Sequence, residues 1–295
     1  MGRPTSKRTL KIIDAVKSIV RPDRPTTIRF VLYKLISLGI LESSKDYNQL
    51  QKLITQGRIS GEIDDDCFVD LKRSTILSNT WDDLLDYGQT VIDLYRINPW
   101  KDQDVRVEVW VEKDTVALVL QNATLRWNVP LRASTGFFSR PLIIEAAKQI
   151  VECRKETYIY YVGDFDPSGM DVERAAHEGN DKTGTQKREG LNNLLDKYSD
   201  SRTGIPLVNW ERLAVRPGEF DKLPDYAKVP IKKRDPRSPE FVKEYGEFGA
   251  EVEALSEEEL CGRIESAIES HIDQVRWKKS EQREKADKKE LSKLF

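Results

Sequence analysis

The sequence predicts an α/β protein in which a helical N-terminal domain precedes a larger domain built on a mostly parallel sheet. Apolar residues recur at helical spacing through the first 60 residues, which indicates packed amphipathic helices. Residues 105–162 instead alternate between apolar strand segments and helical segments, an order that favours a parallel sheet with helices on its faces. The chain of 295 residues is long enough for two domains. We place them at 1–98 and 103–295.

Three helices followed by a hairpin are predicted in the N-terminal domain. The first covers residues 5–20, the second begins after Thr26 or Thr27, and the third covers 46–57. Residues 61–72 alternate between apolar and polar side chains, like a short hairpin. This order is typical of a winged helix-turn-helix (CAP-like) domain, whose third helix usually enters the major groove of DNA.

The N-terminal segment is basic. Residues 1–60 contain twelve Lys and Arg but four Asp and Glu, although the whole chain has a formal net charge of -2. A phosphate-binding surface would have this charge, and so would a solvated surface without a ligand, so charge alone leaves both open. If the domain binds DNA, Lys45, Lys52 and Arg58 are the candidates for phosphate contacts.

Strands and helices alternate through the second domain. After a helix at 80–98, we expect a strand at 105–111, a helix at 115–126, a short strand at 129–132, a helix at 139–154, a strand at 157–162, weaker strands at 207–208 and 213–215, and a charged helix or helix pair at 256–290.

Composition excludes several classes of protein. Three Cys and two His, all far apart in sequence, provide no pattern for a structural zinc site or a disulfide framework. This favours a reducing compartment, and we expect a cytoplasmic protein, nucleoid-associated if the source is prokaryotic. No run approaches the roughly 18 apolar residues of a membrane span, so we expect no membrane partner. With so few His, carboxylates, Tyr, Lys and Arg would have to carry any catalysis.

Acidic residues follow two of the predicted strands. Glu112 ends the first strand, and Asp164 and Asp166 follow the strand at 157–162. Functional crevices of open α/β sheets lie outside the carboxyl ends of the strands, where we expect these three carboxylates to converge. Carboxylates held that close repel one another unless a cation lies between them, and Mg²⁺ prefers such oxygen ligands. Asp164 and Asp166 alone would be better explained as ordinary turn residues.

The pattern of Glu112 and the later segment Gly163-Asp164-Phe165-Asp166-Pro167-Ser168-Gly169 resembles the Toprim domain of topoisomerases, primases and some nucleases. Its form is most similar to the A subunit of topoisomerase VI and its relative, the meiotic double-strand-break transesterase. The resemblance implies that Glu112, Asp164 and Asp166 bind Mg²⁺, with Mn²⁺ a possible substitute, and support DNA cleavage. It also implies that Lys113, beside Glu112, faces phosphate.

The same resemblance implies a catalytic tyrosine four residues after an arginine in the winged-helix domain, a spacing that Arg29 and Tyr33 have. On a helical wheel both residues lie away from the apolar stripe of the second predicted helix, so the helix can present a phenol to DNA. Attack by Tyr33 on a phosphodiester would give a 5′-phosphotyrosyl bond and a free 3′-hydroxyl. Because a phenol has a pKa near 10, Arg29 and the metal would have to assist it.

The resemblance, which is greatest to the stand-alone mini-A proteins, implies a homodimer that cuts double-stranded DNA at composite active sites. The segment 251–255 loosely matches a late motif of the family. The chain contains no P-loop, so strand passage would need a separate ATPase subunit. Two alternatives stay open: a Toprim hydrolytic nuclease with water as the nucleophile, and a non-catalytic duplex-DNA-binding protein.

Overall fold

A four-stranded sheet, with all its strands parallel, forms the centre of the larger part of the protein, in strand order β2-β1-β3-β6. The computed structural model describes residues 7–21, 26–68, 78–180, 188–199 and 204–295. The strands of the sheet are β1 (Val105–Val111), β2 (Leu131–Ala133), β3 (Glu156–Val162) and β6 (Val208–Ala214). The predicted α/β class and parallel sheet are confirmed. The two weak strands expected at 207–208 and 213–215 are one continuous strand, β6.

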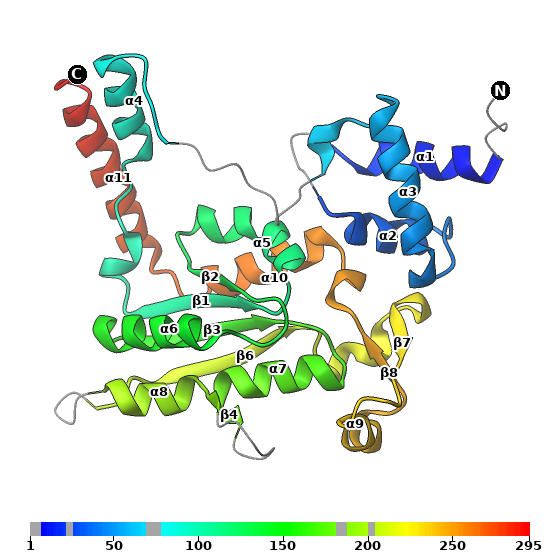
Figure 1. The fold of residues 1–295 in the computed structure, drawn as a ribbon. Coiled ribbons are helices and arrows are strands. Elements are labelled where there is room, and N and C mark those ends of the chain that lie inside the picture. The colour runs from blue at the N-terminus through cyan, green and yellow to red at the C-terminus, as the bar shows by residue number, and fades with distance from the viewer. Residues whose placement is uncertain (1–6, 22–25, 69–77, 181–187, 200–203) are drawn as a thin grey trace.

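Helices cover both faces of this sheet (Figure 1). Valines 107, 109 and 111 of β1 point to one face, where they pack with helices α5 and α10, whereas Trp110 points to the other face, toward α6, α7 and α8. The period of two along the strand therefore divides the apolar residues between two cores. The covering helices are α5 (Asp114–Arg126), α6 (Arg140–Cys153), α7 (Pro167–His177), α8 (Leu191–Tyr198) and α10 (Glu257–Glu269).

Small elements and a last long helix complete this part of the chain. The expected charged helix at 256–290 is two helices, α10 and α11, which are separated by residues 270–273. The smaller elements and the remaining helices are η3 (Pro99–Asp102), β4 (Gly179–Asn180), β5 (Arg188–Glu189), η4 (Pro217–Lys222), η5 (Asp225–Ala227), β7 (Lys228–Pro230), α9 (Ser238–Tyr245), β8 (Phe248–Ala250), η6 (Val252–Ala254) and α11 (Gln274–Leu291).

The N-terminal helices α1 (Lys7–Ile19), α2 (Ile28–Ser37) and α3 (Tyr47–Ile59) are confirmed, with the short helix η1 (Ser44–Asp46) before α3. They enclose a separate apolar core. The side chain of Thr27 caps α2 by accepting a hydrogen bond from the Phe30 amide. Each of these helices buries one apolar stripe in the common core. The stripe repeats at helical spacing in the sequence, which explains why the periodicity located the helices correctly.

The hairpin predicted at 61–72 differs from the structure where it can be compared. Residues Asp65–Cys67 form a short 3₁₀ helix, η2, and Phe68 makes an isolated parallel bridge with Thr26. Residues 69–72 lie outside the described part of the chain. The three helices are therefore shown, and the wing that would complete a winged helix-turn-helix domain is not.

Helix α4 (Leu84–Leu94) lies beside α11, away from the three N-terminal helices (Figure 1). The Tyr95 hydroxyl bonds to Asp287 of α11, and the Ile97 amide donates to Glu284. The predicted domain boundary at residue 98 thus comes after a helix that contacts the C-terminal part of the chain. Among the described helices, none is both long and apolar enough to cross a bilayer.

Candidate functional site

Two buried carboxylates meet at the carboxyl edge of the sheet. Strands β1 and β3 are parallel neighbours, with Val111 opposite Val162, so the residues that follow them emerge side by side. The amide of Asp164 donates a 3.0 Å hydrogen bond to Oε2 of Glu112. Each of the two acidic residues is only 7% exposed. The structure therefore brings Glu112 and Asp164 together, as their positions after parallel strands predict.

Two glycines let the backbone wrap closely around the Glu112 carboxylate. A Cβ on Gly163 would lie 2.9 Å from Oε2 of Glu112. A Cβ on Gly169 would lie 2.4 Å from the carbonyl oxygen of Asp164 and 3.0 Å from Oε2 of Glu112. The first and last glycines of the segment 163–169 are thus required by close approach to the acidic pair.

The pair resists ionisation. Burial, reinforced by repulsion from Asp164, raises the pKa of Glu112 to about 7. Burial also raises the pKa of Asp164 to about 6, with Glu253 raising it further and Lys113 opposing the shift. Two desolvated carboxylates that repel each other gain stability from a nearby cation. Their chemistry fits Mg²⁺, which commonly uses one or two carboxylates together with water and substrate phosphate.

Asp166 is placed differently from the other two predicted ligands. It is the N-cap of α7, and its Oδ1 accepts a 2.7 Å hydrogen bond from the Gly169 amide. Within the residues that the structure describes, no group of three or more His, Cys, Asp or Glu side chains is arranged to hold a metal ion. In this conformation the acidic centre is a pair, Glu112 and Asp164, with Asp166 beside it at the start of a helix.

Lys113 is enclosed by carboxylates. Its Nζ lies 2.8 Å from Oδ2 of Asp164, 2.8 Å from Oε2 of Glu253 and 3.9 Å from Oε2 of Glu251. Burial would lower its pKa, but these carboxylates outweigh burial and hold the pKa well above its usual value. That Lys113 faces phosphate stays a prediction; in this conformation its single positive charge is shared among three carboxylates.

Helix α2 docks onto the same acidic edge. The guanidinium of Arg29 donates to Glu251, with Nε 2.9 Å from Oε2, and lies 3.3 Å from Oε1 of Glu253. One turn later, Tyr33 is only 3% exposed. Its hydroxyl is buried and interacts with the carboxylate of Glu251. Burial, together with the nearby charge of Glu251, raises its pKa above the usual value.

The prediction of an exposed phenol is therefore wrong for this conformation. The helical wheel placed Tyr33 away from the apolar stripe of α2, but its side chain packs in the core of the N-terminal helices, and α2 also meets the segment Val252–Ala254. A wheel gives the direction of a side chain and not what packs against it, which explains the error.

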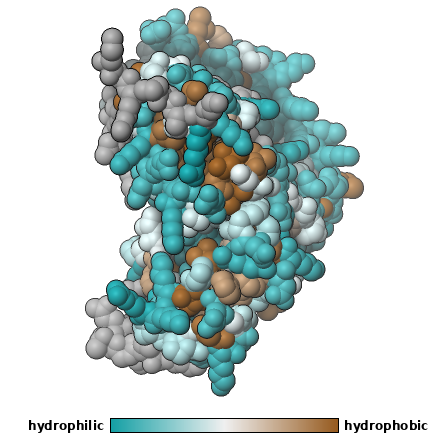
Figure 2. All heavy atoms as spheres, turned by 90° about the vertical axis from the view of Figure 1, so that its right-hand side faces the viewer, coloured by the Kyte–Doolittle hydropathy of each residue, from teal (hydrophilic) through white to brown (hydrophobic). Residues whose placement is uncertain are grey.

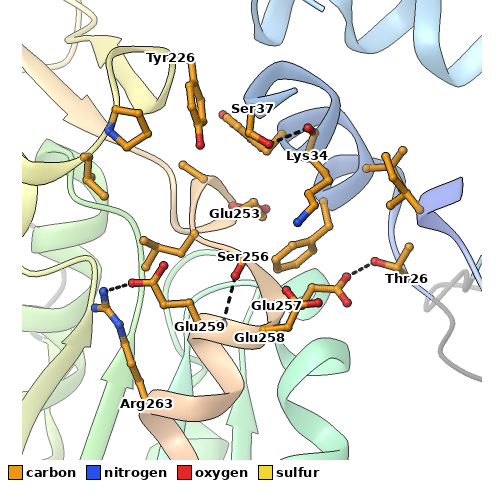
Figure 3. Close-up of a pocket in the computed structure, with 18 of the residues that line it drawn as sticks. Thr26, Lys34, Ser37, Tyr226, Glu253, Ser256, Glu257, Glu258, Glu259 and Arg263 are labelled. Carbon is orange, nitrogen blue, oxygen red and sulfur yellow. Dashed lines mark hydrogen bonds and ion pairs between the residues drawn. The ribbon is translucent and has the colours of Figure 1, made fainter. Parts of the chain in front are cut away.

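A crevice of about 730 Å³ runs between α2 and the segment leading into α10, and Tyr33 is among its lining residues. Lys34 extends into it from α2 and faces acidic side chains of residues 253–259 (Figure 3). On the right-hand side of Figure 1, which faces the viewer in Figure 2, the surface is hollowed at mid-height, between the N-terminal helices above and the region of β7, β8 and α9 below. The lining carries both signs of charge, and several of its carboxylates would repel a nucleic-acid strand.

The predicted phosphate contacts are not equivalent. Lys45 and Lys52 are exposed on η1 and α3. Arg58 is instead bonded to Asp65 at 2.6 Å, and its guanidinium lies over the ring of Phe68. Two of the three basic side chains are thus available to a phosphate backbone.

The sequence did not lead us to predict three residues of this site: Glu251, Glu253 and Arg212. Glu251 and Glu253 lie 222 and more residues from Arg29 in sequence. The loose match of segment 251–255 to a family motif was the signal available for them. Arg212, on β6, bonds to the backbone carbonyl oxygens of Gly163 and Asp164, and for it the signal was a basic residue next to the apolar segment 213–215.

No protein-family model matches this chain, and no curated protein is significantly similar to it in sequence. The case for a function therefore depends on the residues and their geometry.

Proposed function

We propose that this protein is a Mg²⁺-dependent DNA-cleaving transesterase of the topoisomerase VI A type, with a winged-helix tyrosine domain and a Toprim domain. One observation carries the proposal. The helix that bears Tyr33 and Arg29 docks, through Glu251 and Glu253, onto the edge of the sheet where Glu112 and Asp164 meet. The contact supports the proposal because it brings a tyrosine, an arginine and an acidic pair to one region from segments that are far apart in sequence.

In the proposed reaction, the Tyr33 hydroxyl oxygen bonds to the phosphorus of a phosphodiester while the bond from phosphorus to the 3′-oxygen breaks. The phenolic proton is transferred, directly or through water, to the departing 3′-oxygen. The products are a 5′-phosphotyrosyl link and a free 3′-hydroxyl. Arg29 would stabilise the developing negative charge on the phenol and the phosphoryl group.

Glu112 and Asp164 would hold the metal ion, which when bound supplies positive charge to the phosphoryl centre and to the leaving oxygen. The raised pKa of both carboxylates supports this assignment, because a cation would favour their ionised forms. Asp166 would join them through its second carboxylate oxygen, because Oδ1 accepts the hydrogen bond from the Gly169 amide. Lys45 and Lys52 would contact the DNA backbone outside the reacting group.

Burial of Tyr33 adds a requirement to this mechanism. DNA can reach the hydroxyl only after a rearrangement around α2, because Tyr33 is 3% exposed and packs in the core of the N-terminal helices next to the segment 251–255. We further propose, from the family resemblance, that two chains act as a homodimer on duplex DNA and that a separate ATPase subunit would be needed for strand passage.

The deciding experiment is a denaturing gel of labelled plasmid incubated with Mg²⁺ or Mn²⁺. Wild-type protein should form a covalent protein–DNA adduct, and Tyr33→Phe should abolish it because the attacking oxygen is lost. Tyr47→Phe, on the neighbouring helix α3, is the matched control and should retain the adduct. An adduct that survives in Tyr33→Phe would exclude this tyrosine as the nucleophile.

A hydrolytic Toprim nuclease is the second candidate, and the burial of Tyr33 is the observation that favours it. With water as the nucleophile, Tyr33→Phe would leave strand cleavage intact and Asp164→Asn would stop it. If neither metal supports cleavage by the wild type, and DNA binding is tight and salt-sensitive, the chain is a non-catalytic DNA-binding protein.

A further inference from the structure

Arg212 is a buried arginine of β6 that bonds to the loop carrying Asp164. Its side chain is 8% exposed. Nη1 donates to three backbone carbonyl oxygens, those of Gly163 at 3.0 Å, Asp164 at 3.0 Å and Val215 at 3.1 Å. One nitrogen of the guanidinium therefore holds the turn that follows β3 against the end of β6.

One peptide group links Arg212 to Glu112. The carbonyl oxygen of Gly163 and the amide of Asp164 belong to the same peptide bond. Arg212 binds that peptide at its oxygen, and Glu112 accepts a hydrogen bond from its N–H. A cation on the carbonyl polarises the peptide and strengthens its N–H as a donor, so Arg212 acts on the acidic pair through this bond.

The guanidinium is itself fixed from two further elements. Nε donates a 2.7 Å hydrogen bond to Oε2 of Glu173, on α7, whose Oε1 accepts from the Trp210 indole. The group also lies 5.1 Å from the centre of the Tyr161 ring on β3. Arg212 thus connects β3, β6 and α7 at the point where the loop 163–166 leaves the sheet.

The remaining nitrogen of Arg212 argues against a purely stabilising role. Nη2 is buried and has no hydrogen-bond partner in the part of the chain that the structure describes. A buried donor without a partner costs roughly 1–3 kcal/mol. Arg132 provides the contrast, because all of its guanidinium nitrogens are bonded to Glu108, Gln149 and Glu145, none of which belongs to the acidic pair.

We infer that Arg212 is the positioning residue of the Glu112–Asp164 pair and sets its affinity for a divalent cation. The inference rests on the proposed metal-binding role of the pair and adds a residue to it. Groups that orient metal ligands typically change metal affinity by 10- to 100-fold when they are replaced.

The test is Mn²⁺ binding, measured by the electron paramagnetic resonance signal of free Mn²⁺ in the absence of DNA. Arg212→Gln should weaken binding at least tenfold. Arg212→Lys should stay within about threefold of wild type, because an ammonium has three donors for the same carbonyls. Arg132→Gln is the control: it removes an equally buried guanidinium and should leave Mn²⁺ affinity unchanged, while thermal denaturation shows whether each variant is folded.

The outcomes separate this inference from the proposed function. Equal Mn²⁺ affinity in wild type and Arg212→Gln overturns the inference and leaves the metal site standing. Equal losses in Arg212→Gln and Arg132→Gln, or no rescue by Arg212→Lys, also overturn it, because the effect is then a general loss of structure. If wild-type protein binds no Mn²⁺, both the inference and the proposed metal-dependent function fail.

Discussion

At the scale of single residues, the fold buries the acidic pair in a place that disfavours the ionised forms of both carboxylates. Glu112 and Asp164 are each 7% exposed and lie in direct contact, so both are easier to protonate than in water. A structural role would not require two neighbouring carboxylates to be desolvated together. Perturbed acids clustered at a strand edge are a frequent property of functional sites.

The raised pKa of Glu112 predicts how stability changes with pH in metal-free protein. Folded protein keeps the proton up to a pKa of about 7, whereas the ordinary value is 4.5. Between these values the folded state binds more protons than the unfolded state, so the free energy of unfolding falls as pH rises. Glu112→Gln stays neutral and should be more stable than wild type at pH 8, by roughly 1–3 kcal/mol.

Urea denaturation from pH 4.5 to 8, in the presence of a chelator, measures this effect. Glu240→Gln, on the exposed surface of α9, is the control and should follow the wild-type curve. Parallel curves for wild type and Glu112→Gln would show that the acidic pair is not strained in the metal-free protein.

At the scale of the element, the start of α7 has two functions that can be separated. Asp166 caps the helix through the Gly169 amide, and Pro167 occupies the first turn, where its missing N–H is not needed. The same carboxylate is a proposed metal ligand. The sequence pattern Asp-Pro-Ser-Gly therefore encodes a good helix start whether or not the site binds metal.

Replacing Asp166 by Ser and by Ala distinguishes these functions. Ser can still cap the helix, so Asp166→Ser should keep the thermal stability of wild type, whereas Asp166→Ala should lose about 1 kcal/mol. If the carboxylate also contributes to the site, Asp166→Ser should lose DNA cleavage although its stability is retained. Full cleavage by Asp166→Ser would limit the residue to capping.

At the scale of the whole molecule, the N-terminal helices and the sheet are joined by a contact that mixes charge and apolar packing. Phe30 of α2 belongs to the core on one face of the sheet, and Ala254 packs against the N-terminal core. The ion pairs of Arg29 with Glu251 and Glu253 lie beside them. Tyr33 lies next to this contact and also packs in the N-terminal core, so both limit access to the proposed nucleophile.

Weakening the contact should expose α2. Glu251→Gln removes one charge from the network around Arg29 and Lys113. Hydrogen bonds to charged groups contribute about 1.5–3 kcal/mol when buried and less when half-exposed, so we expect amide exchange in α2 to accelerate roughly three- to tenfold. Mass spectrometry of hydrogen exchange measures it, with Glu240→Gln as the control. Unchanged exchange would mean that apolar packing alone holds α2.

Much of the fold follows from the sequence, because the relevant information is local. The valines at 107, 109 and 111 predict a strand, and the stripe of α2 predicts a helix that buries one face. The hairpin prediction was less accurate, since short alternating runs do not exclude a 3₁₀ turn such as Asp65–Cys67. Helix α4 was located, but the partner against which it packs was not.

The sequence by itself determined the elements and the meeting of Glu112 with Asp164, because residues that follow adjacent parallel strands must emerge at one edge. Only the tertiary structure decided what surrounds that pair. Arg29 and Glu251 are 222 residues apart, and Arg212 reaches Asp164 from 48 residues away. Contacts of this kind depend on how whole elements pack, and no local pattern specifies them.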